Sequence, residues 1–162
     1  MKRENGFTFI EITLVLAIAG FIFTMAFIAL PGLWASERDA ERRDNVLTFV
    51  TKLKDYMTNN NRGALPSDWN AFKTQFLPSN FTDPDGGAYT LSVKKCRSDS
   101  NIDYACVADA TSGINDAGGI NHILYVVTGA VCDGDSPKSS ANPRRVAVLY
   151  KMERSNPYCA NT

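Results

Sequence analysis

An apolar run near the beginning of the chain is the first feature of its pattern. Between Phe7 and Leu30 the only charged residue is Glu11, and five of the nine phenylalanines lie before position 28. As an α-helix this run reaches roughly 36 Å, enough to cross a hydrocarbon layer about 30 Å thick. The pattern therefore predicts a membrane-spanning helix. An ordinary secretory signal peptide is disfavoured, because its apolar stretch is usually only about 7–15 residues long.

The predicted helix contains weak points. Pro31 lacks a backbone donor and Gly32 gives little helical support, so we expect this pair to bend or loosen the helix. Gly20 is a second weak point.

Residues 36–62 are first charged and then amphipathic. In the charged stretch 36–44, Asp39 and Arg43 stand four residues apart and are expected to pair on a solvated helix face. Asparagines and a glycine at 59–63 predict the end of the helix. The apolar residues that follow the charged stretch recur at helical spacing. This predicted stripe comprises Val46, Leu47, Val50, Leu53 and Met57. One helix from about Phe9 to about Asn60 is therefore expected, with its second half packed on a globular domain.

The rest of the chain is predicted to begin with a short helix and to continue as strands. Ser67-Asp68 offers an N-cap to a helix that ends before Pro78 and carries Trp69, Phe72 and Phe76. The composition of residues 83–87 predicts a turn. Apolar runs then predict about four strands, at 89–94, 102–107, 120–131 and 145–152. Because the connections between the strands are mostly short, the strands are expected to pair antiparallel. The expected fold is therefore α+β, with a long N-terminal helix packed on a roughly four-stranded antiparallel sheet.

Charge and composition narrow the range of possible functions. Lys and Arg number 17 against 17 Asp and Glu, so a basic nucleic-acid-binding protein is not indicated. His122 is the single histidine, and we interpret it as structural because a Ser-His or Cys-His catalytic site has no other candidate base. No enzyme is therefore expected. Lys138, Arg144 and Arg145 form a small basic patch, which solubility explains as well as DNA capture does.

Four cysteines, all in the distal part of the chain, fit disulfides in an oxidising compartment beyond a membrane anchor. Lys2 and Arg3 also favour a cytoplasmic N-terminus, although cations at 38–43 weaken the asymmetry. The four cysteines allow three disulfide connectivities, and their number alone leaves all three open. Among the possible pairs we favour Cys96–Cys106, which would close a hairpin across residues 97–101.

The leader and the apolar run together form a motif. Two cations precede Gly6, the aromatic Phe7 follows it, and Glu11 is the fifth residue after that junction. This arrangement resembles the processing and assembly motif of type IV prepilins and the related pseudopilins. In that family a prepilin peptidase cuts after the leader glycine and methylates the new N-terminal amine. The resemblance thus implies cleavage after Gly6, whose lack of a side chain lets a peptidase approach closely, and methylation of Phe7.

The resemblance also gives Glu11 an assembly role. An acid at the centre of a membrane helix costs about 2.5–3.5 kcal/mol, and less near an end. In pilins the corresponding acid pairs with the N-terminal amine of a neighbouring subunit, which here implies pairing between Glu11 and Phe7 of adjacent copies. The implied division is a leader (1–6), a transmembrane and assembly helix (7–30), an amphipathic half (31–62) and a globular domain (63–162).

Further likenesses concern the globular part. Residues 83–89 resemble the Asp-Pro…Gly…Tyr turn that precedes the first strand of many pilins, and Cys132 with Cys159 resembles their terminal disulfide. Calcium is bound in some pseudopilins, and two acid pairs are candidates for it. These are Asp83 with Asp85 and Asp133 with Asp135. Neither has EF-hand spacing, and Asp in turns usually bonds to the backbone, so no cofactor is expected.

The resemblance implies a structural subunit of a type IV pilus, held in the cytoplasmic (inner) membrane as a precursor and polymerised into an extracellular filament for adhesion, motility or DNA uptake. The implied partners are other copies of the chain, prepilin peptidase, the inner-membrane assembly platform with its motor, minor pilins, and membrane lipid before assembly. Two alternatives stay open. One is a pseudopilin of a type II-like secretion system, and the other is a single-pass anchored binding module that never polymerises.

Overall fold

The computed structural model describes residues 6–59, 63–98, 101–102 and 122–162. The chain divides into two compact units, Met1–Glu37 and Arg38–Thr162. Helix α1 (Phe9–Asn59) contributes residues to both. Its extent confirms the predicted long helix to within one residue at its end.

Helix α1 is unbroken at the predicted weak points. Gly20, Pro31 and Gly32 all lie inside it. Pro31 removes the hydrogen bond that the carbonyl of Phe27 would accept, but the flanking turns keep their own bonds. The chain in isolation therefore has no helix break here, and loosening at these residues stays a prediction.

In the unit Met1–Glu37 the large apolar side chains of the helix are exposed. An 18-residue stretch of this helix has a mean hydropathy of 2.5, and none of it is buried within the protein. Exposed side chains include Phe9, Phe21, Phe23 and Phe27. A helix that is apolar all round and has no protein partner fits a lipid environment.

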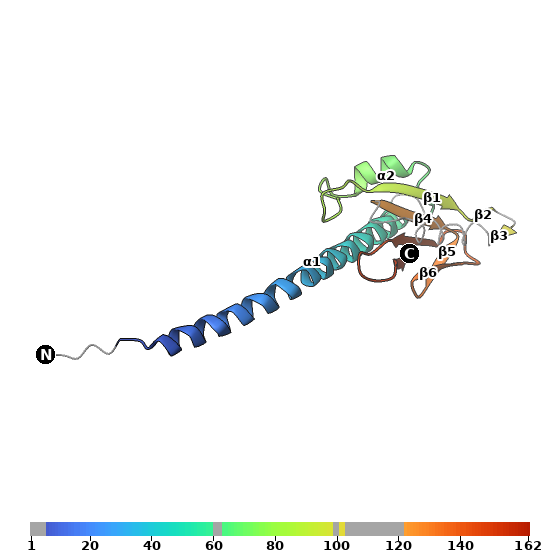
Figure 1. Ribbon diagram of the computed structural model, residues 1–162. Coiled ribbons are helices and arrows are strands. Elements are labelled where there is room, and N and C mark those ends of the chain that lie inside the picture. Colours follow the sequence, from blue (N-terminus) through green and yellow to red (C-terminus); the bar gives the residue numbers. More distant parts are fainter. Residues whose placement is uncertain (1–5, 60–62, 99–100, 103–121) are drawn as a thin grey trace. The chain divides into compact units, whose positions relative to one another are not determined.

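In the unit Arg38–Thr162 the second half of α1 packs on the sheet (Figure 1). Most of the predicted stripe is confirmed, since Val46, Val50 and Leu53 are buried. Leu47 is an error in that stripe, because it is 44% exposed, and Phe49 is completely buried in its place. Phe49 lies three residues after Val46 and therefore shares its face, whereas Leu47 is rotated by about 100° from it.

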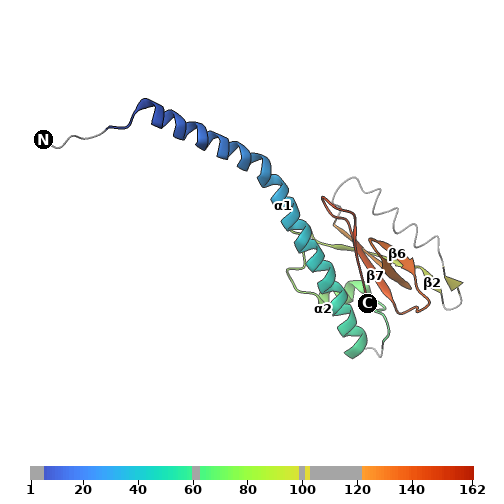
Figure 2. The ribbon, with the colours of Figure 1, turned by 90° about the horizontal axis from the view of Figure 1, so that it is seen from below.

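Helix α2 (Trp69–Phe76) confirms the predicted short helix. The side chain of its N-cap, Asp68, accepts hydrogen bonds from the backbone N–H groups of Asn70 at 2.8 Å and Ala71 at 3.0 Å. Aromatic rings then join α2 to the last turns of α1, which lie beside it in Figure 2. The pairs are Phe49–Phe72, Tyr56–Phe72 and Tyr56–Phe76, all edge to face.

The main sheet has four strands in the order β1-β4-β7-β8. These are β1 (Thr90–Lys95), β4 (Ile123–Thr128), β7 (Val146–Tyr150) and β8 (Tyr158–Asn161). Strands β4, β7 and β8 pair antiparallel, but β1 and β4 are parallel, so the prediction of an all-antiparallel sheet is wrong. The long connection between β1 and β4 gives the chain room to return and start β4 at the same end as β1.

The apolar run 120–131 contains two strands rather than one. Gly129, with φ of 73°, ends β4, and the chain continues as β5 (Ala130–Asp133), which pairs with β6 (Ser136–Ser139) in a small hairpin. Two further short strands, β2 (Arg97–Ser98) and β3 (Asn101–Ile102), also pair. The predicted strand at 102–107 is described only at Ile102, and the rest of it lies outside the described residues.

A disulfide joins the hairpin to the last strand. Cys132 of β5 and Cys159 of β8 are bonded, with their Cα atoms 5.8 Å apart, which confirms this pairing. The predicted Cys96–Cys106 pair cannot be followed, because Cys106 lies outside the described residues. Cys96 itself is fully buried next to β4 and β7.

Candidate functional site

The residues of the predicted cleavage junction are accessible. Gly6 and Phe7 precede the first turn of α1 and are exposed, and the Phe7 side chain has 84% of its surface free. Thr8 follows and is the residue that caps the helix. Gly6 and Phe7 thus lie ahead of the helix, where a peptidase active site can reach the peptide bond between them.

Glu11 forms a capping box with Thr8. One of its carboxylate oxygens, Oε2, accepts hydrogen bonds from the Thr8 backbone N–H at 2.8 Å and from the Thr8 hydroxyl at 2.7 Å. In return the Glu11 N–H donates to the Thr8 hydroxyl at 3.4 Å. This reciprocal pattern satisfies backbone donors that a helix start leaves free. This capping box is not among the features predicted above, although Thr-x-x-Glu before an apolar run is the pattern that signals it.

The capping box leaves part of the Glu11 carboxylate unused. Oε1 has no hydrogen-bond donor within the part of the chain that the structure describes. Glu11 thus holds the helix start with one oxygen and offers the other to a donor from outside.

A second cluster is centred on Arg42 of α1. This guanidinium is only 1% exposed, yet it forms three close ion pairs, with Asp39 at 3.0 Å, Asp83 at 2.9 Å and Glu153 at 3.1 Å. Its bond to Asp83 is bidentate, with Nε to Oδ2 at 2.9 Å and Nη2 to Oδ1 at 2.9 Å. Tyr150 of β7 donates its hydroxyl to the same carboxylate at 2.7 Å. Arg42 therefore ties the helix to the turn after residue 82 and to the chain beyond β7.

The pairing predicted within the charged stretch is wrong. Asp39 pairs with Arg42 instead of Arg43, and its carboxylate also accepts the backbone N–H groups of Glu153 at 2.8 Å and Arg154 at 3.0 Å. Arg43 instead lies over the ring of Tyr158 at 5.6 Å. The helix face of the stretch 36–44 that we expected to be solvated is thus partly buried, because the chain after β7 covers it.

These contacts shift the pKa values of Arg42, Asp83 and Glu153 in the direction that favours the charged form of each group. Burial alone would lower the pKa of Arg42, but its hydrogen bonds to Asp83 and Glu153 outweigh burial and raise it above the ordinary value. Burial likewise would raise the pKa of Asp83, yet hydrogen bonds from Arg42 and Tyr150 lower it. Hydrogen bonds from Arg38 and Arg42 lower the pKa of Glu153 to about 2. Arg42, Asp83 and Glu153 are thus all charged at neutral pH.

We expect the stability of the globular unit to fall in acid. The folded-state pKa values of Asp83 and Glu153 lie below their ordinary values of 3.8 and 4.5, so both carboxylates stabilise the fold above those values. The free energy of unfolding, measured with urea across a pH series, should decline as pH falls from 4.5 towards 2. Glu153→Gln should remove part of that decline, and a flat profile over this window would contradict the assignment.

The turn at 83–87 has the predicted form, but its acids are already engaged. The Asp83 carbonyl accepts the N–H of Gly86 at 2.8 Å, and Gly86 has φ of 92°. His122 Nε2 lies 2.7 Å from Asp85 Oδ1, and its ring is so close to Gly87 that a Cβ there would be 2.3 Å away. Asp83, Asp85 and His122 could in principle ligate a metal. However, Arg42 already neutralises Asp83, and a cation beside its guanidinium would be repelled.

The other calcium candidates do not come together. Asp133 forms an ion pair with Lys138 at 3.0 Å, and Asp135 accepts a hydrogen bond from Asn156 at 3.2 Å. The two acids flank Gly134 in the turn of the β5–β6 hairpin, where φ is 63°. Contacts within the protein thus account for both side chains.

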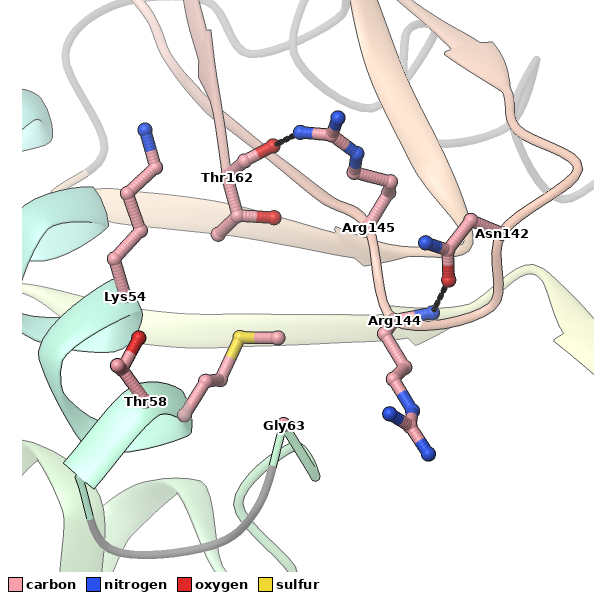
Figure 3. Close-up of a pocket in the computed structure, with 8 residues that line it drawn as sticks. Lys54, Thr58, Gly63, Asn142, Arg144, Arg145 and Thr162 are labelled. Carbon is pink, nitrogen blue, oxygen red and sulfur yellow. Dashed lines mark hydrogen bonds between the residues drawn. The ribbon is translucent and has the colours of Figure 1, made fainter.

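The predicted basic patch is also partly neutralised. Lys138 is paired with Asp133, and Arg145 donates to the Thr162 carbonyl oxygen. Arg144 and Arg145 line a cavity of about 270 Å³ together with Lys54, but Figure 3 shows the Lys54 amine and the Arg144 guanidinium pointing in opposite directions. These cations do not converge on one ligand position.

A comparison with known families finds one match. Residues 1–27 match the family model described as the prokaryotic N-terminal methylation motif. No curated protein and no solved structure matches the chain. The chain thus carries the class III signal typical of type IV pilins and pseudopilins, on a fold with a long helix against a four-stranded mixed sheet. The motif implies processing by prepilin peptidase and assembly into a pilus-like system from a membrane precursor, and proteins of this kind are generally structural rather than enzymatic.

Proposed function

We propose that this protein is a structural subunit of a type IV pilus. It is made as a precursor in the cytoplasmic membrane, cut between Gly6 and Phe7, methylated on Phe7, and polymerised into a surface filament for adhesion, motility or DNA uptake. The observation that carries the proposal is the methylation motif at residues 1–27, joined directly to an apolar helix whose side chains no other part of the described chain covers.

The apolar side chains of the helix need a covering partner both in the membrane precursor and in the filament. The exposed side chains of Phe9, Phe21, Phe23 and Phe27 would be costly in water, at roughly 25 cal/mol per Å² of apolar surface. Lipid covers them in the precursor, and the same helix of other subunits covers them in the filament. Because lipid is as apolar as these side chains, the exchange gives little hydrophobic gain. Packing and polar pairing must therefore favour the filament.

Glu11 supplies the polar pairing in this proposal. Its Oε2 keeps the hydrogen bonds from Thr8, and its Oε1 accepts a hydrogen bond from the methylated amine of Phe7 of an adjacent subunit. Two unit charges 4 Å apart attract by up to about 4 kcal/mol at an effective dielectric near 20, before desolvation is subtracted. A subunit docked out of register would lose this attraction, so the pair selects the correct position.

Mass spectrometry of filaments sheared from cells tests the proposal. We expect a chain that begins at Phe7 and carries one methyl group on its N-terminal amine. Gly6→Ala enlarges the residue at the cut and should leave the precursor unprocessed in the membrane fraction. Gly20→Ala is the matched control and should be processed normally, because Gly20 has open space around it.

The same measurement separates the alternatives. A processed chain found in the membrane and periplasm but never in the sheared fraction would contradict a surface pilus and favour a secretion pseudopilin. A chain that keeps residues 1–6 in every fraction would contradict processing itself and favour an anchored binding module.

A further inference from the structure

A tryptophan closes the apolar run of α1 at its far end. Trp34 follows Pro31, Gly32 and Leu33, and the next charged residue is Glu37. The Trp34 side chain is 57% exposed, and its indole N–H has no acceptor among the residues that the structure describes. An indole combines a large apolar body with one polar donor, which suits the boundary between lipid tails and water.

The chain's other tryptophan has a different environment. Trp69, at the start of α2, is only 8% exposed and packs edge to face on Phe72 in the core of the globular unit. Core packing thus accounts for Trp69, whereas no contact among the described residues accounts for Trp34.

The length of helix between Glu11 and Trp34 matches a bilayer. At a rise of about 1.5 Å per residue, this stretch is about 35 Å long, and it contains no charged residue. The hydrocarbon core of a bilayer is about 30 Å thick, and the headgroup regions bring the total to about 40–45 Å. With Trp34 in one headgroup region, the carboxylate of Glu11 reaches the other.

We propose that Trp34 anchors the precursor in the lipid headgroup layer opposite its N-terminus and thereby sets the depth of Glu11. The indole N–H donates to an ester or phosphate oxygen of the lipid, while the ring lies against the upper part of the acyl chains. This inference rests on the proposed function, in which the precursor resides in a membrane. Held in this way, Glu11 lies at the edge of the hydrocarbon, where a charged carboxylate is tolerated and its Oε1 is accessible.

Depth-dependent fluorescence quenching of the full-length precursor tests the anchor. The protein is reconstituted at low density in vesicles of phosphatidylcholine and phosphatidylglycerol, with bromine placed on the acyl chains either near the glycerol or near the methyl ends. Wild type is compared with Trp34→Phe, in which Trp69 alone reports the background. The double variant Phe23→Trp/Trp34→Phe is the matched control, because position 23 lies midway between Glu11 and Trp34 and is also exposed.

We expect the Trp34 emission, taken as wild type minus Trp34→Phe, to be lost more strongly to the shallow bromines than to the deep ones. The emission of the tryptophan placed at position 23 should instead be lost more strongly to the deep bromines than to the shallow ones. If position 23 is quenched by deep bromines but Trp34 is quenched by neither lipid, or mainly by the deep one, the anchor is wrong while membrane insertion stands. Absence of quenching at both positions would mean that the helix does not enter the bilayer, which would overturn the inference and the membrane stage of the proposed function together.

Discussion

Arg42→Ala is expected to lower the free energy of unfolding of the globular unit by about 3–5 kcal/mol, because it leaves Asp83 and Asp39 charged and buried without their cation. Asp83 is fully buried at its side chain and, besides its bonds to Arg42, accepts the hydroxyl of Tyr150. Urea unfolding of the full-length protein in detergent micelles, followed by near-ultraviolet circular dichroism, measures the loss.

Two comparisons make this result specific. Arg38→Ala removes a solvent-exposed partner of Glu153 and should cost much less than Arg42→Ala, because water screens the lost ion pair. The double variant Arg42→Met/Asp83→Asn removes both charges of the buried pair and should be more stable than Arg42→Met alone. Equal losses for Arg38→Ala and Arg42→Ala would show that the cluster is not buried in solution.

Glu11→Ala is expected to abolish filaments while the precursor remains in the membrane. The change removes both the capping-box acceptor for Thr8 and the negative charge that faces the neighbouring Phe7 amine. Insertion itself should be unaffected or improved, because an acid is costly in lipid. Electron microscopy of cells together with immunoblots of membrane and sheared fractions measures the two effects.

Glu11→Gln separates the two roles of this side chain. Glutamine can accept the same hydrogen bonds from Thr8, so the helix start is kept, but it carries no charge. If the intersubunit ion pair drives assembly, Glu11→Gln should lack filaments, as Glu11→Ala does. Normal filaments with Glu11→Gln would contradict the ion pair and leave helix capping as the role of Glu11. Thr8→Val, which loses the hydroxyl but keeps the backbone donor, should weaken the cap and leave the charge in place.

The parts of the fold that were predicted well depend on signals local in the sequence. Helix α1 was placed to within one residue because an apolar run, an amphipathic stripe and a glycine-containing end all lie in consecutive residues. The N-cap Asp68 and the turn at 83–87 were found for the same reason. Leu47 was misassigned because a loose apolar stripe does not fix the exact helix face that meets the sheet.

The errors concern contacts between distant residues. Strand β1 pairs parallel with β4 across a long connection, a choice that strand patterns do not encode. Arg42 looked like one more surface cation, and only the packing of the turn at Asp83 and the segment at Glu153 made it a buried centre. The four-residue spacing favours Arg43 as the partner of Asp39 only on a helix face that is open to water. In the folded protein other segments cover this face, so the spacing rule does not apply.

The sequence by itself determined the apolar character of the first half of α1 and the methylation motif at residues 1–27. A long uncharged run, a single acid near its start and a glycine before an aromatic residue are properties of neighbouring residues, and their physical consequences need no tertiary contact. Tertiary structure alone decided which charges are buried and how the sheet is ordered. Those features depend on where folding brings separate segments and side chains together, and desolvation and hydrogen-bond geometry act only once they are close.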